Sequence, residues 1–186
     1  MRIAFKEWAV VVDALGRGDQ ILILRKGGIA EGPGGFKAEH PEFWLFPTLF
    51  HQQRERVIEP ARWRYDEIAP HLPEVGKVRL EFLARVVGVW RLQTLAEAER
   101  LRDQHIWRDE VIAGRCDWGR EPGLHALAVR VFRLPKPVEW PMRPEYAGCK
   151  SWVELEADPP KDGLSPVLGE SEFAAKLEWL RSVLPA

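Results

Sequence analysis

The sequence lacks the features that mark secreted, disulfide-linked or membrane-spanning proteins. Its 186 residues include no asparagine, four serines and two cysteines, Cys116 and Cys149. No apolar run approaches the roughly 18 residues that cross a bilayer, and the apolar stretch over 8–12 is too short for the core of a signal peptide. Two isolated cysteines are too few for a disulfide framework, so each is expected to be a small buried thiol. We therefore expect a cytoplasmic chain that does not contact a membrane.

An excess of charge of one sign is also missing. The chain carries 27 basic and 28 acidic side chains, a formal net charge of −1. No field of the whole protein would draw such a chain onto a polyanion, so any surface for nucleic acid must be a local patch. Tryptophan, in contrast, is abundant. Nine tryptophans imply either a bulky aromatic core or exposed rings that bind a partner, and most are expected in the core.

Several catalytic and metal-binding motifs are absent as well. No serine lies in Gly-x-Ser-x-Gly, and neither of the common glycine motifs that cradle phosphate occurs. There is no Cys-x-x-Cys and no His-Glu-x-x-His, so we expect no metal and no cofactor. No acidic residue stands two positions before a lysine, the arrangement that places both side chains on one face of a strand in restriction-type nucleases. These absences count against the most common hydrolase and nuclease mechanisms.

Hydrophobic periodicity and turn residues predict the secondary structure. Residues 3–15 are open between a helix, because apolar residues recur at helical spacing from Phe5 to Leu15, and a strand, because Val10 to Val12 are β-branched. Strands are expected at 21–24, 43–46, 78–92, 124–134 and 152–155, and helices at 49–57, 95–106 and 171–184.

Particular residues predict where some of these elements begin, bend or end. Thr94 and Glu97 have the spacing of a capping box at the start of a helix. Gly88 is expected to mark a bulge, and Pro135 and Pro137 are expected to close the strand over 124–134. The polar segment 59–76, which is punctuated by proline and glycine, is expected to be mostly irregular.

Together these features predict an α+β fold. Hydrophobic residues make up 46% of the chain and are spread along all of it, which suits one core at this length. We expect a single domain over 1–186, with a mixed or antiparallel sheet of about five strands packed against three to four helices.

Four clusters of polar and aromatic residues lie at the ends of the expected strands, where loops commonly carry function. Cations followed by glycines suit the binding of phosphate or carboxylate, and glycine-rich turns are equally common as plain loops. The candidates for anion binding are Arg25, Lys26, Gly27, Gly28, Gln52, Arg115 and Lys150. The aromatic candidates are Trp44, Trp107, Tyr146 and Trp152, and the catalytic candidates are His51, His105 and Glu31.

Two of these clusters contain residues with simpler explanations. His105 is expected near the end of the capped helix, where the helix dipole favours a cation, so a capping role explains it without catalysis. Cys149 follows Gly148 in a tight turn, and no Cys–His pair can be inferred from spacing. A buried thiol is therefore favoured over a nucleophile.

Several blocks of the sequence resemble the family called domain of unknown function 1802. The blocks are Phe5 to Trp8, Leu24 to Ile29, Phe46 to Thr48 with His51 and Gln52, His105 to Trp107, and Tyr146 to Leu155. The resemblance covers about 4–156 and leaves the final helix outside. It implies no assigned reaction or cofactor, only an association with restriction-type nuclease domains and therefore with DNA or RNA.

Three functions remain compatible with the sequence. The leading hypothesis is a nucleic-acid-associated binding or accessory module whose cations contact phosphate and whose rings stack on an unpaired base. The alternative is an enzyme acting on phosphoesters or nucleotides with a histidine as general base. The third is a partner protein that forms a homo-oligomer through exposed tryptophans.

The hypothesis of a shared site makes one geometric prediction. The turn that begins at Arg25, the segment at His51 and the turn that leads to Trp152 are expected to converge on one side of the sheet. In coordinates, the side chains of Lys26, His51 and Lys150 would then border one pocket.

Overall fold

A computed structural model describes residues 2–26, 40–48, 53–71, 76–119, 122–148 and 150–184. The candidates Gly27, Gly28, Glu31, His51 and Gln52, together with Cys149, lie outside the described residues. The strands are β1 (Ile3–Trp8), β2 (Leu22–Arg25), β3 (Glu42–Thr48), β4 (Lys77–Leu92), β5 (Leu124–Pro141), β6 (Trp152–Glu154) and β7 (Ser165–Pro166). The α-helices are α1 (Ala9–Arg17), α2 (Glu59–Ile68), α3 (Leu95–Glu99), α4 (Asp109–Asp117) and α5 (Glu170–Val183).

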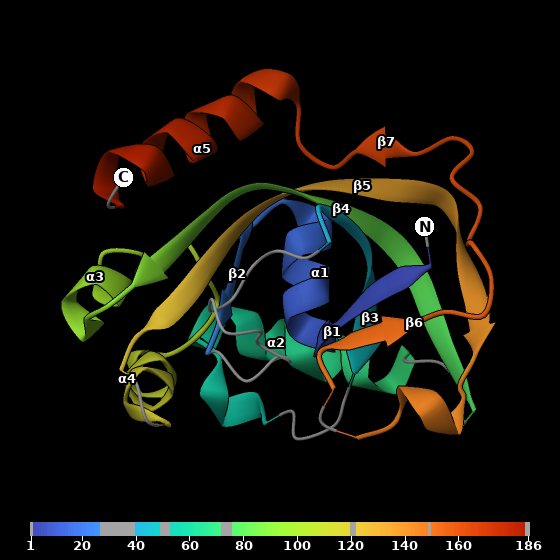
Figure 1. The fold of residues 1–186 in the computed structure, drawn as a ribbon, viewed down its shortest axis with the longest axis horizontal. Helices are drawn as coiled ribbons and strands as arrows, with labels where there is room; N and C mark the ends of the chain where they lie inside the picture. The colour runs from blue at the N-terminus through green and yellow to red at the C-terminus, as the bar shows by residue number, and fades with distance from the viewer. Residues whose placement is uncertain are drawn as a thin grey trace.

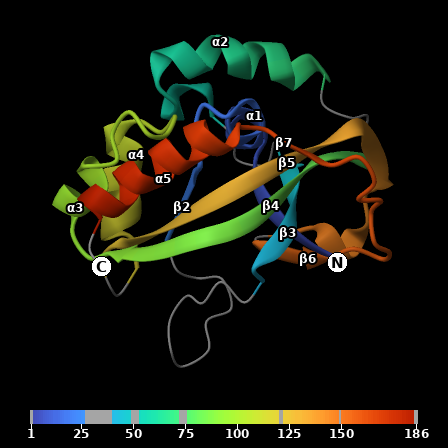
Figure 2. The ribbon, with the colours of Figure 1, turned by 90° about the horizontal axis from the view of Figure 1, so that it is seen from above.

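The expected α+β class is confirmed, with a single mixed sheet. Six of its seven strands follow the order β2-β5-β4-β3-β1-β6, and β7 pairs with β5 beside this path. Strands β1 and β3 are parallel and the other pairs are antiparallel. The sheet curves around α1, which lies in its concave side, and α5 extends from the segment after β7 towards α3 (Figures 1 and 2).

The segment 3–15 contains both of the structures that its sequence left open. Strand β1 ends at Trp8 and α1 begins at the next residue. The three adjacent valines lie in α1 because this helix is surrounded by core, where packing outweighs the modest preference of valine for strands. The C-cap is Gly18, whose φ of 78° suits glycine.

Three expectations about helices are wrong. Of the expected helix over 49–57, the described part, 53–57, contains a short 3₁₀ turn and the β-bridge residue Val57. Segment 59–76 contains α2, which has Pro60 in its first turn, the one part of a helix that tolerates a missing N–H. The expected helix over 95–106 ends at Glu99. The capping box of Thr94 and Glu97 is confirmed, but after α3 the chain makes tight turns that bring Trp107 to a β-bridge with Val57.

Strand β5 continues through the prolines that were expected to end it. Between Leu80 and Phe82 of β4 the register shifts, and Pro135 lies in the irregular part of β5 opposite. A residue without an N–H is tolerated where a bulge interrupts the ladder. A second shift, between Val86 and Gly88, confirms the expected bulge.

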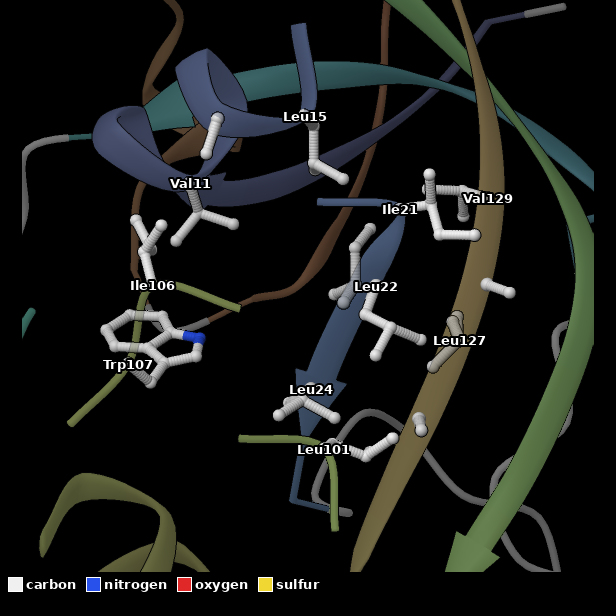
Figure 3. Close-up of a cluster of buried hydrophobic side chains, with 14 of the residues drawn as sticks. Val11, Leu15, Ile21, Leu22, Leu24, Leu101, Ile106, Trp107, Leu127 and Val129 are labelled. Atoms are coloured by element: carbon white, nitrogen blue, oxygen red, sulfur yellow. The ribbon is translucent and has the colours of Figure 1, made fainter. Parts of the chain in front are cut away.

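The core lies mainly between α1 and the concave side of the sheet. Figure 3 shows side chains of α1, β2 and β5 meeting Ile106 and Trp107, which come from the chain after α3. A second buried cluster contains Trp44, Phe46 and Tyr146 on the other side of the sheet. The first core fixes the ends of β1 and β2 relative to α4, and these ends carry the site described next.

Candidate functional site

The ends of β1 and β2 meet the last turns of α4, and side chains of these segments bond to one another's backbone. The Arg25 guanidinium donates to the backbone oxygen of Lys6 (2.6 Å), and that of Arg115 donates to the backbone oxygen of Leu24 (3.2 Å). The Lys26 ammonium donates to the backbone oxygen of Cys116 (2.9 Å). Arg25 and Lys26, which form one candidate cluster in the sequence, are therefore neighbours of Arg115, which comes from another.

A buried carboxylate, Glu7, lies among these cations. It is 2% exposed. One of its oxygens accepts a hydrogen bond from the Trp8 backbone N–H (2.8 Å), and the other lies 3.6 Å from Nε of Arg25. Because a carboxylate is rarely buried without a cation beside it, Glu7 and Arg25 are best understood as a structural pair.

Arg115 is the most buried cation of the group. Its guanidinium lies over the Trp107 ring, 3.9 Å from the ring centroid. Burial lowers the pKa of Arg115 to about 10, attraction to Glu7 opposes this shift, and repulsion from Arg25 and Arg56 adds to it. Arg115 thus remains charged at neutral pH in surroundings that contain more positive than negative charge.

We call Arg25, Lys26, Arg56 and Arg115 the cationic cluster. Its members differ in exposure: Arg25, Lys26 and Arg115 are half-buried, and Arg56 is exposed on the short 3₁₀ turn Arg54–Arg56. The backbone oxygen of Arg56 accepts from the Arg108 N–H, which ties this turn to the chain just before α4. The cluster therefore runs from the buried Glu7 to the surface.

The turn that precedes β6 lies against the same strand, β1. The Lys6 ammonium donates to the backbone oxygens of Tyr146 (2.8 Å) and Gly148 (2.7 Å). On the other face of β1, the Phe5 ring contacts both the Arg25 guanidinium (4.7 Å to the centroid) and the Trp152 ring (4.6 Å between centroids). Arg25 and Trp152, from two of the three segments expected to converge, thus both contact Phe5. The third segment, at His51, lies outside the described residues.

Three of the aromatic candidates are not presented at the surface. Trp44 is 0% exposed, and Trp107 and Tyr146 are each 2% exposed. Their rings fill the two cores, so the expectation that they stack on a base does not fit their burial. Trp152 is half-buried against Phe5, Phe43 and His40. Lys150 is exposed on the segment leading into β6.

His105 is part of the structure around Trp107 and does not cap a helix. It lies beyond the end of α3, it is 5% exposed, and its Nδ1 accepts a hydrogen bond from the Trp107 backbone N–H (3.2 Å). Burial lowers its pKa to about 4, with a further lowering from the charge of Arg115. The imidazole is therefore neutral at pH 7, and its acceptor nitrogen is already occupied.

Comparison with known protein families identifies the family of this chain. The model of the family described as domain of unknown function, DUF1802, matches residues 4–178, nearly the whole chain. The chain belongs to the DUF1802 family. The match includes most of α5, which the resemblance in the sequence had left outside.

Other comparisons add little to this membership. No curated protein matches the chain. A solved structure described as the crystal structure of ASCH from Zymomonas mobilis aligns with 96% of this chain and 94% of that one, with a TM-score of 0.47 and 11% identity. We draw nothing about function from a likeness at this level.

Two residues of the candidate site could not be identified from the sequence. Glu7 was overlooked because a helix over 3–15 would place it on a polar face, whereas in a strand it shares a face with Phe5. The available signal was the charged pair Lys6-Glu7 inside an otherwise apolar run. Arg56 was overlooked because it reaches the cluster through the bridge between Val57 and Trp107, and residue spacing carries no trace of such a bridge.

The described residues contain neither a candidate metal centre nor a membrane-spanning helix. Within the described ranges, no three histidine, cysteine or acidic side chains are grouped so that they could hold a metal ion. Among the helices of those ranges, none has the length and hydropathy of a membrane-spanning segment.

The buried His105 predicts a pH dependence of stability in this DUF1802 chain. Its pKa in the folded state, about 4, lies below the ordinary value of 6.5, so the unfolded chain takes up the proton more readily. Stability is therefore lost as the pH falls from about 6.5 towards 4. Between pH 7 and pH 5 the protein should lose about 2 kcal/mol more of its unfolding free energy than the His105→Gln variant. Urea unfolding at pH 7, 6 and 5 measures this difference, and parallel losses in the two proteins would refute it.

Proposed function

We propose that this chain is a nucleic-acid-associated binding module whose cationic cluster contacts phosphate groups. The observation that supports this most directly is the imbalance of charge around Arg115. The charges with the largest effect on its guanidinium are one carboxylate, Glu7, and two further guanidinium groups, Arg25 and Arg56. An anion bound beside them would relieve this repulsion, and phosphate oxygens suit guanidinium donors.

The difference in exposure across the cluster fits contact with a ligand from outside. Glu7 and the stacked Arg115 form the buried end, so the arginines there are held in fixed positions. Arg56 lies at the surface and Lys26 is half-buried, so a phosphate can approach the cluster from the solvent side. Positioned arginines and lysines of this kind supply most of the affinity for a nucleic-acid backbone and little of the sequence specificity. The formal charge of −1 makes such a local patch necessary for binding.

The alternative enzyme has less support. Of the catalytic candidates, His105 is the one within the described residues, and its occupied acceptor nitrogen and lowered pKa do not suit a general base at neutral pH. We therefore put binding ahead of catalysis.

The proposal is tested by fluorescence anisotropy with labelled oligonucleotides at low salt. The variant Arg25→Ala/Lys26→Ala should bind about tenfold more weakly or worse, because hydrogen bonds to charged groups contribute about 1.5–3 kcal/mol each. The matched control is Lys77→Ala/Arg79→Ala, which removes the same charge from β4, where Lys77 pairs with Glu139 and Arg79 with Glu81. Its affinity should equal that of the wild type.

A second variant distinguishes the loss of phosphate contacts from the loss of folded protein. Arg25→Ala leaves Glu7 without its ion pair, whereas Lys26→Ala keeps that pair intact and should still weaken binding several-fold. Equal weakening in the cluster variants and in the β4 control would mean that general charge, and not this site, holds the oligonucleotide, and the proposal would fall.

A further inference from the structure

Trp118 is the most exposed of the large apolar side chains in the described part of the chain. It is 66% exposed, compared with 53% for Trp63 and 38% for Trp179. It follows α4 directly, and its backbone is extended (φ −73°, ψ 137°), so the chain leaves the helix at this residue. A tryptophan left in water at a helix end contributes little to the core, and its exposure calls for another explanation.

The position of Trp118 is defined by its neighbours. A Cβ added to Gly119 would lie 3.8 Å from Cε of Lys26, so the Lys26 side chain runs alongside the residue that follows Trp118. The same lysine donates to the backbone oxygen of Cys116, two residues before Trp118. Arg115 precedes Cys116 and reaches back to β2. The chain at Trp118 therefore passes next to the cationic cluster, within reach of the same ligand.

We propose that Trp118 stacks on an unpaired base of single-stranded nucleic acid whose phosphates contact the cationic cluster. This inference rests on the proposed function and narrows it to one class of ligand. An aromatic platform beside cations that follow the backbone is the usual arrangement for binding single strands, because every base offers a flat face to a ring.

The chemistry favours a single strand over the other ligands of the cluster. The bases of a duplex are already stacked on one another, so they do not offer their faces to Trp118 unless a base is flipped out. Inorganic phosphate would satisfy the cations and leave the indole unused. An apolar protein partner would cover Trp118, but it would also have to bury Lys26 and its neighbours without counter-charges, which is costly.

The experiment compares two labelled oligonucleotides of equal length, an oligothymidylate and its abasic analogue, which has the same phosphates and no bases. The Trp118→Ala variant should bind the oligothymidylate about tenfold more weakly than the wild type, since stacking contributes roughly 1–3 kcal/mol per base. Its affinity for the abasic strand should be unchanged. Trp118→Phe should retain most of the affinity, and Trp179→Ala, which removes an exposed ring from α5, should have no effect.

The outcomes separate this inference from the proposed function. If Lys26→Ala weakens binding of both strands and Trp118→Ala weakens neither, phosphate binding stands and the stacking role of Trp118 is refuted. A wild-type protein that binds duplex as tightly as single strand would also refute it. A wild-type protein that binds no oligonucleotide at all would overturn the proposed function and this inference together.

Discussion

The variant Glu7→Gln is expected to lower the free energy of unfolding by about 4 kcal/mol, because removing one partner of a buried ion pair leaves the other charge uncompensated. Glutamine has nearly the same shape and keeps an oxygen to accept the Trp8 N–H. What it removes is the negative charge that Arg25 and Arg115 face at this 2% exposed position. Urea unfolding monitored by circular dichroism gives the free energies.

The control for this prediction is Glu139→Gln. Its carboxylate pairs with Lys77 at 2.7 Å, but the side chain is 65% exposed, and surface pairs of this kind contribute about 0–1 kcal/mol. Equal losses in the two variants would mean that Glu7 does not balance buried charge. Glu7→Gln also adds one net positive charge to the site. The folded fraction of this variant should therefore bind oligonucleotide at least as tightly as the wild type.

The second large effect is expected at Gly123, which connects α4 to β5. Its φ is 106°, and a Cβ at this position would lie 2.3 Å from the backbone oxygen of Leu92, an atom that cannot move without disturbing the end of β4. Gly123→Ala should therefore lower the free energy of unfolding by about 4 kcal/mol, as the sum of backbone strain and a steric clash.

Gly76→Ala separates these two contributions. Gly76 has a similar φ of 95°, but its added Cβ would meet nothing within 4 Å. The free energy of unfolding of Gly76→Ala should fall by about 1–2 kcal/mol, from backbone strain alone. The urea unfolding curves of the two variants should differ accordingly, and indistinguishable curves would show that the contact with Leu92 costs nothing.

Much of the fold could be predicted because its strands are long, apolar and bounded by turn residues. β4, with its bulge at Gly88, and α5 agree closely with their sequence patterns. The errors arose where tertiary packing overrides local preference. Valines form the helix α1 inside the core, Pro135 lies in a bulge that only the pairing with β4 reveals, and Pro60 begins a helix that was expected to be irregular.

The site was predictable only in part, for a related physical reason. Arg25 and Lys26 lie at the end of an expected strand, where functional side chains are common, so the sequence indicated both. Arg115 was indicated by its proximity in sequence to His105 and Trp107. Glu7 required knowing that residue 7 belongs to a strand. The choice among tryptophans required burial, which composition does not reveal: Trp107 packs in the core while Trp118 is exposed.

The central claim, that the cationic cluster holds phosphate, is tested most directly by the salt dependence of oligonucleotide binding. For single strands the slope of log affinity against log salt is about −0.7 for each phosphate contacted, so the loss of Arg25 and Lys26 should make the slope shallower by about 1.4. The Lys77→Ala/Arg79→Ala control should keep the slope of the wild type. If the slope is the same in the wild type and in Arg25→Ala/Lys26→Ala, these residues do not contact phosphate and the account is wrong.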